Sequence, residues 1–293
     1  MSENAGQPVW LITGSSAGLG LALTRYALSQ GHRVIATSRS PPKTPDLVQE
    51  VESQGGKWLA LDTTQTDQQI KEIVRQAESF FGRIDVLVNN AAFCVLGAVE
   101  DLPDADIVLQ MRTNFLGPVR IMQAVLPGMR KRRSGMIMNV SSTQGFVASH
   151  ACGVYAASKF ALEAMSEACR AEVAAFGIRV LIIEPGAFRT GFANPSAAKY
   201  IEPSEAYAGE HVVNQRLIQV NKYIGTAMGS PEKAAMVMFE AATGKGAAGE
   251  LIEKEKILRV ILGPDSWKAI DMKIKELRRS ADLIQEVAAS TNL

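Results

Sequence analysis

The sequence is poor in the residues that build disulfide frameworks and metal sites. It has three cysteines, Cys94, Cys152 and Cys169, and three scattered histidines in 293 residues. The cysteines are odd in number and form no C-x-x-C pair, which argues against a disulfide framework. Zinc sites need about three or four clustered ligands. We therefore predict a protein without a metal centre.

The sequence also lacks an excess of either charge and any long apolar run. Thirty-one lysines and arginines oppose thirty aspartates and glutamates, for a net charge of +1. This balance argues against a broadly basic surface for nucleic acid. No apolar run reaches the ~18 residues of a membrane span, and the N-terminus lacks the regions of a secretory signal. We expect a cytoplasmic protein with a small-molecule partner, no nucleic-acid partner and no membrane span.

Short apolar runs rich in β-branched residues alternate with helical stretches as far as residue 183. The predicted strands are Val9–Thr13, Arg33–Thr37, Lys57–Leu61, Ile84–Val88, Met136–Val140 and Arg179–Ile183. Because these strands are continuously apolar, both faces of their sheet should be covered, as in parallel α/β sheets. Right-handed crossovers then give a doubly wound, Rossmann-type α/β fold. Ligands of such sheets bind beyond the carboxyl ends of the strands.

The segments between and after the strands can be assigned more coarsely. Predicted elements are a helix over Thr66–Phe80 with Thr66 as N-cap, two helices within Asp104–Arg130, a helix around Ala206–Val220, a helix over Pro231–Ala242 and a short strand near Leu251. Residues 191–230 hold prolines, serines and glycines, and we expect a helical lid over the sheet there. A C-terminal helical extension covers about 264–293, so we predict one domain over residues 1–293 with a variable lid.

A glycine-rich turn follows the first predicted strand directly. Residues 13–20 read TGSSAGLG, with Gly14, Gly18 and Gly20 spaced G-x-x-x-G-x-G. Glycines permit a tight turn and let backbone approach a pyrophosphate. The helix that starts here presents unpaired N–H groups to an anion. We predict a dinucleotide site at this turn, including Ser16 and Leu19.

The same turn also fits a different motif. Residues 14–18 match G-x-S-x-G, the nucleophile elbow of hydrolases, with Ser16 as nucleophile. That chemistry needs an Asp and a His near the ends of later strands, and the only late histidine, His211, falls in the predicted lid. The dinucleotide interpretation is therefore favoured over the hydrolase.

The end of the second predicted strand indicates which dinucleotide binds. An NAD site usually places an acidic residue there for the ribose hydroxyl. This sequence has Ser38 and Arg39 instead. The planar guanidinium of Arg39 suits a 2′-phosphate, so we predict NADP(H).

Tyr155 and Lys159 are four residues apart on a predicted helix and share one face. A lysine ammonium ~4–5 Å from a phenol would stabilise the phenolate by ~3–4 kcal/mol at an effective dielectric constant of ~20. We therefore expect the pKa of Tyr155 to be lowered toward neutrality, so that it can act as an acid–base group. Ser141 and Ser142 follow the fifth predicted strand, where a hydroxyl can polarise a substrate carbonyl.

Six motifs occur in order along residues 8–192: TGSSAGLG, NNAA (89–92), Asn114, NVSS (139–142), YAASK (155–159) and PGAFRT (185–190). Together they resemble the short-chain dehydrogenase/reductase family of the compact single-domain type. The resemblance implies a hydride-transfer oxidoreductase. One departure is Ala92, where the family usually has glycine.

The resemblance also implies roles for individual residues. Tyr155 is similar to the family's general acid, Lys159 to its pKa-lowering lysine, Ser142 to its substrate-orienting serine, and Asn114 to the asparagine of a proton-relay kink. The implied cofactor-binding residues are Gly14, Ser16, Gly18, Leu19, Gly20, Ser38, Arg39, Asp62, Asn89, Asn90, Tyr155, Lys159, Pro185, Gly186 and Thr190. A homo-oligomer is a further expectation.

Several alternatives stay open at this point. The same fold could host a cofactor-dependent isomerase or dehydratase, or a non-catalytic NADP-sensing protein. His150 and Cys152 could form a nucleophilic pair, although no activating third group is evident. The aromatic residues Phe188, Phe192, Tyr200, Tyr207 and Tyr223 either line an apolar, bulky substrate pocket or form the core of the lid.

Overall fold

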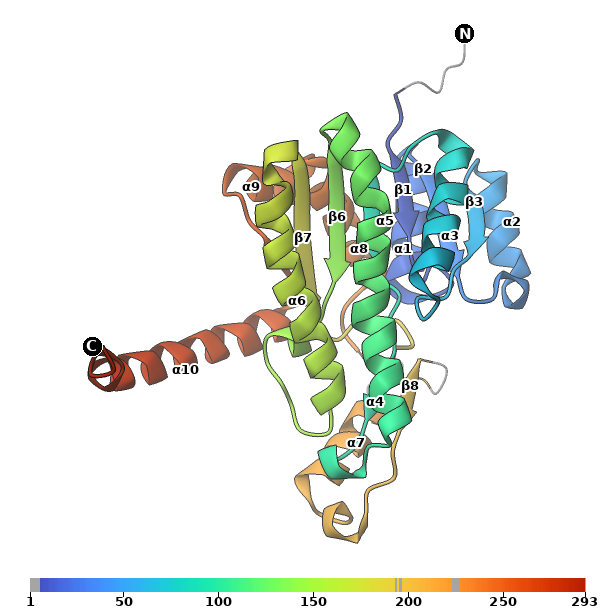
Figure 1. The fold of residues 1–293 in the computed structure, drawn as a ribbon. Coiled ribbons are helices and arrows are strands. Elements are labelled where there is room, and N and C mark those ends of the chain that lie inside the picture. Colours follow the sequence, from blue (N-terminus) through green and yellow to red (C-terminus); the bar gives the residue numbers. More distant parts are fainter. Residues whose placement is uncertain (1–5, 193, 195–196, 223–226, 293) are drawn as a thin grey trace.

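The computed structural model describes residues 6–192, 194, 197–222 and 227–292. Its centre is a seven-stranded parallel sheet in the order β3-β2-β1-β4-β6-β7-β9, shown in Figure 1. The strands are β1 (Val9–Ile12), β2 (Arg33–Ser38), β3 (Lys57–Ala60), β4 (Val86–Asn89), β6 (Gly135–Val140), β7 (Ile178–Pro185) and β9 (Arg259–Leu262). The predicted doubly wound α/β fold is confirmed.

Helices cover both faces of this sheet. They are α1 (Gly18–Ser29), α2 (Pro45–Ser53), α3 (Asp67–Phe81), α4 (Asp104–Met111), α5 (Gly117–Arg132), α6 (Gly153–Val173), α7 (Val212–Lys222), α8 (Pro231–Thr243), α9 (Gly246–Lys254) and α10 (Pro264–Ala289). Alternate residues of each strand point to opposite faces. Trp10 and Ile12 of β1 therefore pack with α1 and α8, whereas Val9 and Leu11 pack with α3, α5 and α6.

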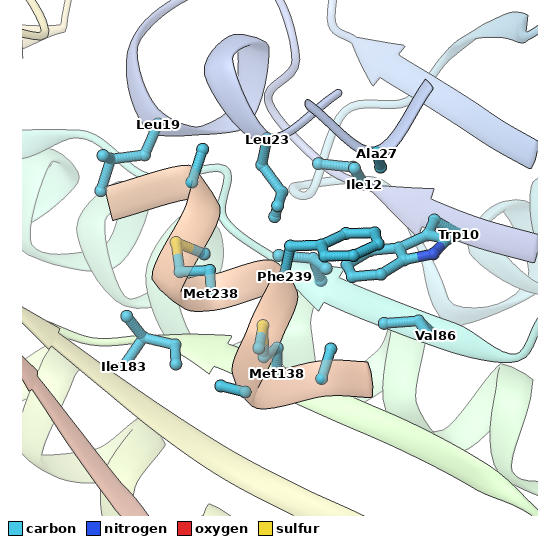
Figure 2. Close-up of a cluster of buried hydrophobic side chains, with 14 of the residues drawn as sticks. Trp10, Ile12, Leu19, Leu23, Ala27, Val86, Met138, Ile183, Met238 and Phe239 are labelled. Atoms are coloured by element: carbon cyan, nitrogen blue, oxygen red, sulfur yellow. The ribbon is translucent and has the colours of Figure 1, made fainter. Parts of the chain in front are cut away.

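The layer that holds α1 and α8 is built around two stacked aromatic rings (Figure 2). The ring centroids of Trp10 and Phe239 lie 5.5 Å apart with planes 5° from parallel. Met238, next in the chain to Phe239, is fully buried in the same cluster. This packing joins a helix from residue 231 onward to the first strand, so the C-terminal part of the chain completes the core.

Local signals in the sequence set several helix ends. Thr66 accepts a hydrogen bond from the Gln69 N–H (3.3 Å), and the Thr66 N–H donates to the Gln69 side chain (3.0 Å). This reciprocal capping box confirms Thr66 as the N-cap of α3. Gly82, with φ of 79°, ends the helix in the left-handed region.

The structure corrects the prediction of a short strand near Leu251. This residue lies in α9, and the last strand of the sheet is β9, eight residues later. Leu251 and Ile252 are followed by charged residues at helical spacing, and only Ile252 is buried. The β-branched pair Val260 and Ile261 supplies the strand instead. The predicted lid helix also starts later, at Val212.

The segment predicted as two helices within Asp104–Arg130 forms a nearly continuous helical rod. A π-helical turn over Arg112–Leu116 joins α4 to α5. Such turns are rare and occur frequently at functional sites. Asn114 lies in this turn and is fully buried.

A second, two-stranded parallel sheet was not predicted. It pairs β5 (Cys94–Leu96) with β8 (Ala198–Tyr200). The pairing brings the start of the region after residue 191 against the segment that follows β4. Its strands have three residues each, too short for alternation to be recognised in the sequence.

The last helix, α10, differs from the others because most of it extends away from the body of the molecule (Figure 1). Its first two turns pack beside β9 through the buried residues Ser266 and Ile270. Among the described residues, no helix combines the length and apolar character needed to span a membrane.

Two methionines of α8 test the packing in Figure 2. Met238 is fully buried, whereas Met236 is 39% exposed. We expect Met238→Ala to lower the free energy of unfolding by about 2–5 kcal/mol through lost burial and a cavity. The matched change Met236→Ala should cost less than about 1 kcal/mol. Urea unfolding measures both, and equal losses would contradict the packing.

Candidate active site

The glycine-rich turn between β1 and α1 is fastened by Asn90, which follows β4. The Asn90 Nδ2 donates to the carbonyl oxygens of Thr13 (2.9 Å) and Gly14 (3.1 Å). Gly14 has a φ of 69°, in the left-handed region. A Cβ atom on Gly20 would lie 2.4 Å from the Asn90 Nδ2, so only glycine fits there.

The first turn of α1 suits an anionic ligand. Its N-cap is Ala17, which has no side-chain oxygen for the first N–H groups, and the turn holds no acidic residue. Backbone N–H groups at such a helix start can therefore bind a phosphate. Thr190 lies directly over Gly18, because a Cβ there would be 3.0 Å from the Thr190 Cβ. Ser16 is half-buried in the turn and Leu19 is buried behind it.

The ends of the neighbouring strands β2 and β3 bring three predicted residues to one side of the turn. Ser38 is buried and accepts a hydrogen bond from the Trp58 Nε1 (3.1 Å). Arg39, the next residue, is exposed. Asp62 follows β3 and accepts hydrogen bonds from the N–H and hydroxyl of Thr64, both at 2.8 Å. Since the two strands are parallel and adjacent, Arg39 and Asp62 leave the same edge of the sheet.

Asn89 and Asn90, predicted as a pair, do different work. Whereas Asn90 holds the glycine turn, the Asn89 Nδ2 donates to the Asn139 Oδ1 (2.8 Å), and the Asn139 Nδ2 donates to the Ser166 Oγ (2.8 Å). All three of these side chains are buried. They form a polar link from β4 through β6 to α6, so Asn89 acts in this structure as a brace within the fold.

The four predicted catalytic residues meet at the carboxyl end of β6. Tyr155 shares a side-chain hydrogen bond with Ser142. The Lys159 Nζ donates to the carbonyl of Val140 (2.7 Å) and lies 5.9 Å from the centroid of the Tyr155 ring. Asn114 donates to the Ser158 Oγ (3.1 Å) on the same helix as Tyr155. The π-helical turn thus carries its asparagine to the helix that presents the tyrosine.

The two serines after β6 have separate environments. The Ser141 hydroxyl is buried and donates to the Glu163 Oε1 at 2.5 Å. Ser142, in contrast, is half-buried and accepts from the Gln144 N–H (3.2 Å). This leaves Ser142 as the hydroxyl beside Tyr155, in agreement with the preference for it over Ser141.

The prediction that the pKa of Tyr155 is lowered is wrong for this arrangement. Burial raises the pKa of Tyr155 well above its ordinary value, and the hydrogen bond from Ser142 opposes this only in part. Burial also lowers the pKa of Lys159 to about 8, although Glu163 pulls it back upward. The sequence estimate counted the charge of the lysine but not the cost of burying both groups.

A cluster of charged residues behind the site was missed by sequence reasoning. Arg259 of β9 contacts three glutamates: Glu163 and Glu167 of α6 and Glu184 of β7. Burial, followed by the charge of Glu163, raises the pKa of Glu184 to about 7. Glu163 lies four residues after Lys159, which places both on one helix face. That spacing was the available signal, but the partner on β9 was not visible in it.

The loop that follows β7 is held by the first turn of α10. The N–H of Gly186, next to Pro185, donates to the Leu262 carbonyl (2.8 Å). The Ala187 N–H donates to the Asp265 carboxylate (2.8 Å). The Ser266 hydroxyl donates to the Glu184 carbonyl (3.0 Å). The start of α10 therefore supports the loop that leads to Thr190.

An apolar cluster surrounds Tyr155 on the side away from Lys159. Its buried members are Cys94, Leu96, Ala98, Ala151, Cys152, Tyr155, Ala198, Val213 and Leu217, and Phe192, Tyr200, Tyr207 and Val220 pack against them. The ring of Phe192 lies 5.7 Å from that of Tyr155. Phe188 packs against the other core cluster instead, and Tyr223 lies outside the described residues. Three predicted lid aromatics thus share one cluster with the candidate acid.

The alternative nucleophiles have unfavourable surroundings. Burial raises the pKa of Cys152 and, more strongly, that of Cys94, so both thiols stay protonated near neutral pH. His211 accepts from the Val213 N–H (3.2 Å) and packs edge-on against Tyr207. Within the described ranges, no three His, Cys, Asp or Glu side chains group as metal ligands.

Comparison with known proteins agrees with this geometry. A family model described as short chain dehydrogenase matches residues 8–201. The chain belongs to the short-chain dehydrogenase/reductase family. A solved short-chain dehydrogenase from Streptomyces avermitilis is 34% identical, with a TM-score of 0.85 and full coverage of both chains. The family assignment makes the protein an oxidoreductase.

Two further members of the family bear on the chemistry. The 3-ketodihydrosphingosine reductase of Bacteroides thetaiotaomicron is 39% identical over 210 residues, covering 71% of this chain and 75% of that protein. A metagenomic short-chain oxidoreductase solved with NADP is 29% identical, with a TM-score of 0.58 and coverage of 62% of this chain and 83% of that one. Family membership and the phosphate-ready turn together indicate a nicotinamide dinucleotide cofactor.

The lowered pKa of Lys159 predicts a pH dependence of cofactor binding. The ammonium is lost as the pH rises through about 8, so the dissociation constant for NADPH should increase across that pH in a fluorescence titration. Glu163→Gln removes a charge that holds the pKa of Lys159 up, and the increase should then begin at lower pH. Lys159→Arg, which stays charged, should show no change near pH 8. The same midpoint in wild type and Glu163→Gln would contradict this.

Proposed function

We propose that this protein is an NADP(H)-dependent oxidoreductase that interconverts a carbonyl and a secondary alcohol on an apolar, bulky small molecule. The proposal rests on one observation above all. Tyr155, Ser142, Lys159 and Asn114 converge at the end of β6, inside an apolar cluster. A buried phenol beside a serine hydroxyl suits a carbonyl oxygen that must be polarised and protonated.

The chain's own residues divide the work as follows. Ser142 donates a hydrogen bond to the substrate oxygen and orients it toward Tyr155. The Tyr155 hydroxyl gives its proton to that oxygen during reduction, and its raised pKa keeps it protonated until the oxygen becomes basic. When bound, the nicotinamide supplies or accepts the hydride. The Lys159 ammonium, held by the Val140 carbonyl, stabilises the phenolate that remains.

Asn114 supports the recovery of that proton. Its amide holds the Ser158 hydroxyl and the Phe93 N–H and carbonyl, so both hydrogen-bonding ends are fixed. The widened π-helical turn around it leaves backbone carbonyls free to hold a water molecule next to Lys159. This water would return a proton from solvent through Lys159 to Tyr155.

The substrate class follows from the apolar cluster. Phe192, Tyr200 and Tyr207 pack beside Tyr155 with few charged neighbours. We propose that residues 191–230 form a lid whose apolar side contacts the substrate. The related reductase from Bacteroides thetaiotaomicron is named for a keto substrate, which supports reduction of a ketone.

The NADP preference rests on Arg39. Its side chain is exposed just beyond β2, where the family's NAD-binding members place an acid. A guanidinium there can bind a 2′-phosphate through two hydrogen bonds. The related metagenomic enzyme was solved with NADP, which supports the same choice.

Tyr155→Phe removes only the hydroxyl that gives the proton. We expect the turnover number for a ketone panel with NADPH to fall by about 10²–10⁴-fold, while the NADPH dissociation constant stays within about twofold. Tyr26→Phe, on α1, is the matched control and should keep full turnover. Full turnover by Tyr155→Phe would refute the mechanism, and product without NADPH consumption would favour the isomerase or dehydratase.

Arg39→Ser tests the cofactor preference separately. We expect NADPH binding to weaken by roughly 10- to 150-fold, from the loss of a charge-assisted contact of about 1.5–3 kcal/mol. NADH binding should change little. Arg75→Ala, an exposed arginine of α3, should alter neither affinity. Equal weakening of NADPH and NADH would show that Arg39 does not read the 2′-phosphate.

A further inference from the structure

The outer part of α10 is an unpartnered helix. All described residues from 274 to 292 are exposed. Large apolar side chains are among them, with Ile274 52% exposed, Leu277 48% and Ile284 56%. A helix of this length without packing is only marginally stable in water. Contiguous apolar surface on a projecting element marks an interaction site.

The apolar residues of α10 follow a regular spacing. Trp267, Ile270, Ile274, Leu277, Ala281, Ile284 and Ala288 are separated alternately by three and four residues. This repeat places them in one stripe along the helix, as in the seam of a coiled coil. The stripe begins at Ile270, which is buried against the body, and continues outward without a partner. After Pro264 the helix contains neither glycine nor proline.

The charge of α10 argues for a protein partner over a lipid surface. Residues 264–292 hold five lysines and arginines and five aspartates and glutamates. Helices that lie on anionic membranes carry an excess of basic residues on the polar face. A balanced helix with an apolar seam is instead typical of helix–helix pairing.

We propose that α10 pairs antiparallel with α10 of a second copy of this chain, and two charged positions select this arrangement. Asp271 follows Ile270, and Arg278 follows Leu277, so both flank the stripe on the same side. When Ile274 stacks on the partner's Leu277, Asp271 lies beside the partner's Arg278. The twofold symmetry repeats this opposite-charge contact, which favours the pairing.

Other arrangements of the same stripe bring like charges together. In a parallel pair, Lys273 would lie beside the partner's Arg278. In an antiparallel pair shifted by one seven-residue repeat, Arg278 would face the partner's Arg278. Like-charge contacts of this kind are used to exclude wrong partners and registers. Within one chain, Asp271 pairs with Lys275 (2.6 Å) and Arg278 with Asp282 (3.0 Å), both exposed pairs of small energy.

The first test measures mass in solution by sedimentation of the full chain. Leu277→Glu puts a charge into the stripe, and the wild type should have at least twice the mass of this variant. Met272 is 61% exposed on the same helix but lies off the stripe, so Met272→Glu should keep the wild-type mass. Equal masses of wild type and Leu277→Glu would overturn the proposal.

The second test uses charge reversal, which also fixes the orientation. Asp271→Arg and Arg278→Asp should each weaken self-association by about tenfold, because both symmetric contacts become repulsive. An equimolar mixture of the two variants should recover wild-type association, since each contact then joins an arginine to an aspartate. The double variant should recover it too.

Mixing separates the proposal from its rivals. A defect within one helix, or pairing through any other surface, cannot be repaired by mixing, so failure to recover overturns the antiparallel pairing. Cosedimentation with phosphatidylserine vesicles that is lost in Leu277→Glu, at unchanged mass, would likewise overturn it in favour of a membrane contact.

Discussion

The constraint on which the rest of the molecule depends is that both faces of one parallel sheet must be covered. Each strand divides its side chains between two helical layers, as Trp10 and Leu11 do in adjacent positions of β1. Parallel neighbours require a crossover between strands, and the right-handed crossovers place helices on both faces. The consequence is that every strand ends at the same edge. The glycine turn, Arg39, Asp62 and Ser142 all lie there because of strand direction.

Behind that edge, the site is built around charges that the interior tolerates only in company. Lys159 is buried and holds its ammonium against the Val140 carbonyl. Glu163 lies one turn away and is itself held by Ser141 and Arg259. A buried charge without a partner would be strongly destabilising. The arginine of the last strand thus supports the glutamate that keeps the lysine charged, and β9 contributes to the site without touching it.

The C-terminal part of the chain serves the site in a second way. The first turn of α10 binds the loop after β7 through Asp265 and Ser266, while the rest of the helix extends outward. A helix with one end in the site and an apolar stripe at the other joins the loop that carries Thr190 to the surface proposed for pairing. This surface is distinct from the layer of α5 and α6.

The sequence by itself determined the fold class, the strand order in the chain, the glycine turn and the Tyr155–Lys159 pair, because these depend on local spacing. It did not reveal β9, which was placed near Leu251, or the β5–β8 sheet, whose three-residue strands carry no pattern. Only the tertiary structure decided that Asn89 turns inward while Asn90 fastens the turn. It likewise decided the pKa values of Tyr155 and Lys159, because burial and the distant Glu163–Arg259 contact depend on segments that meet only after folding.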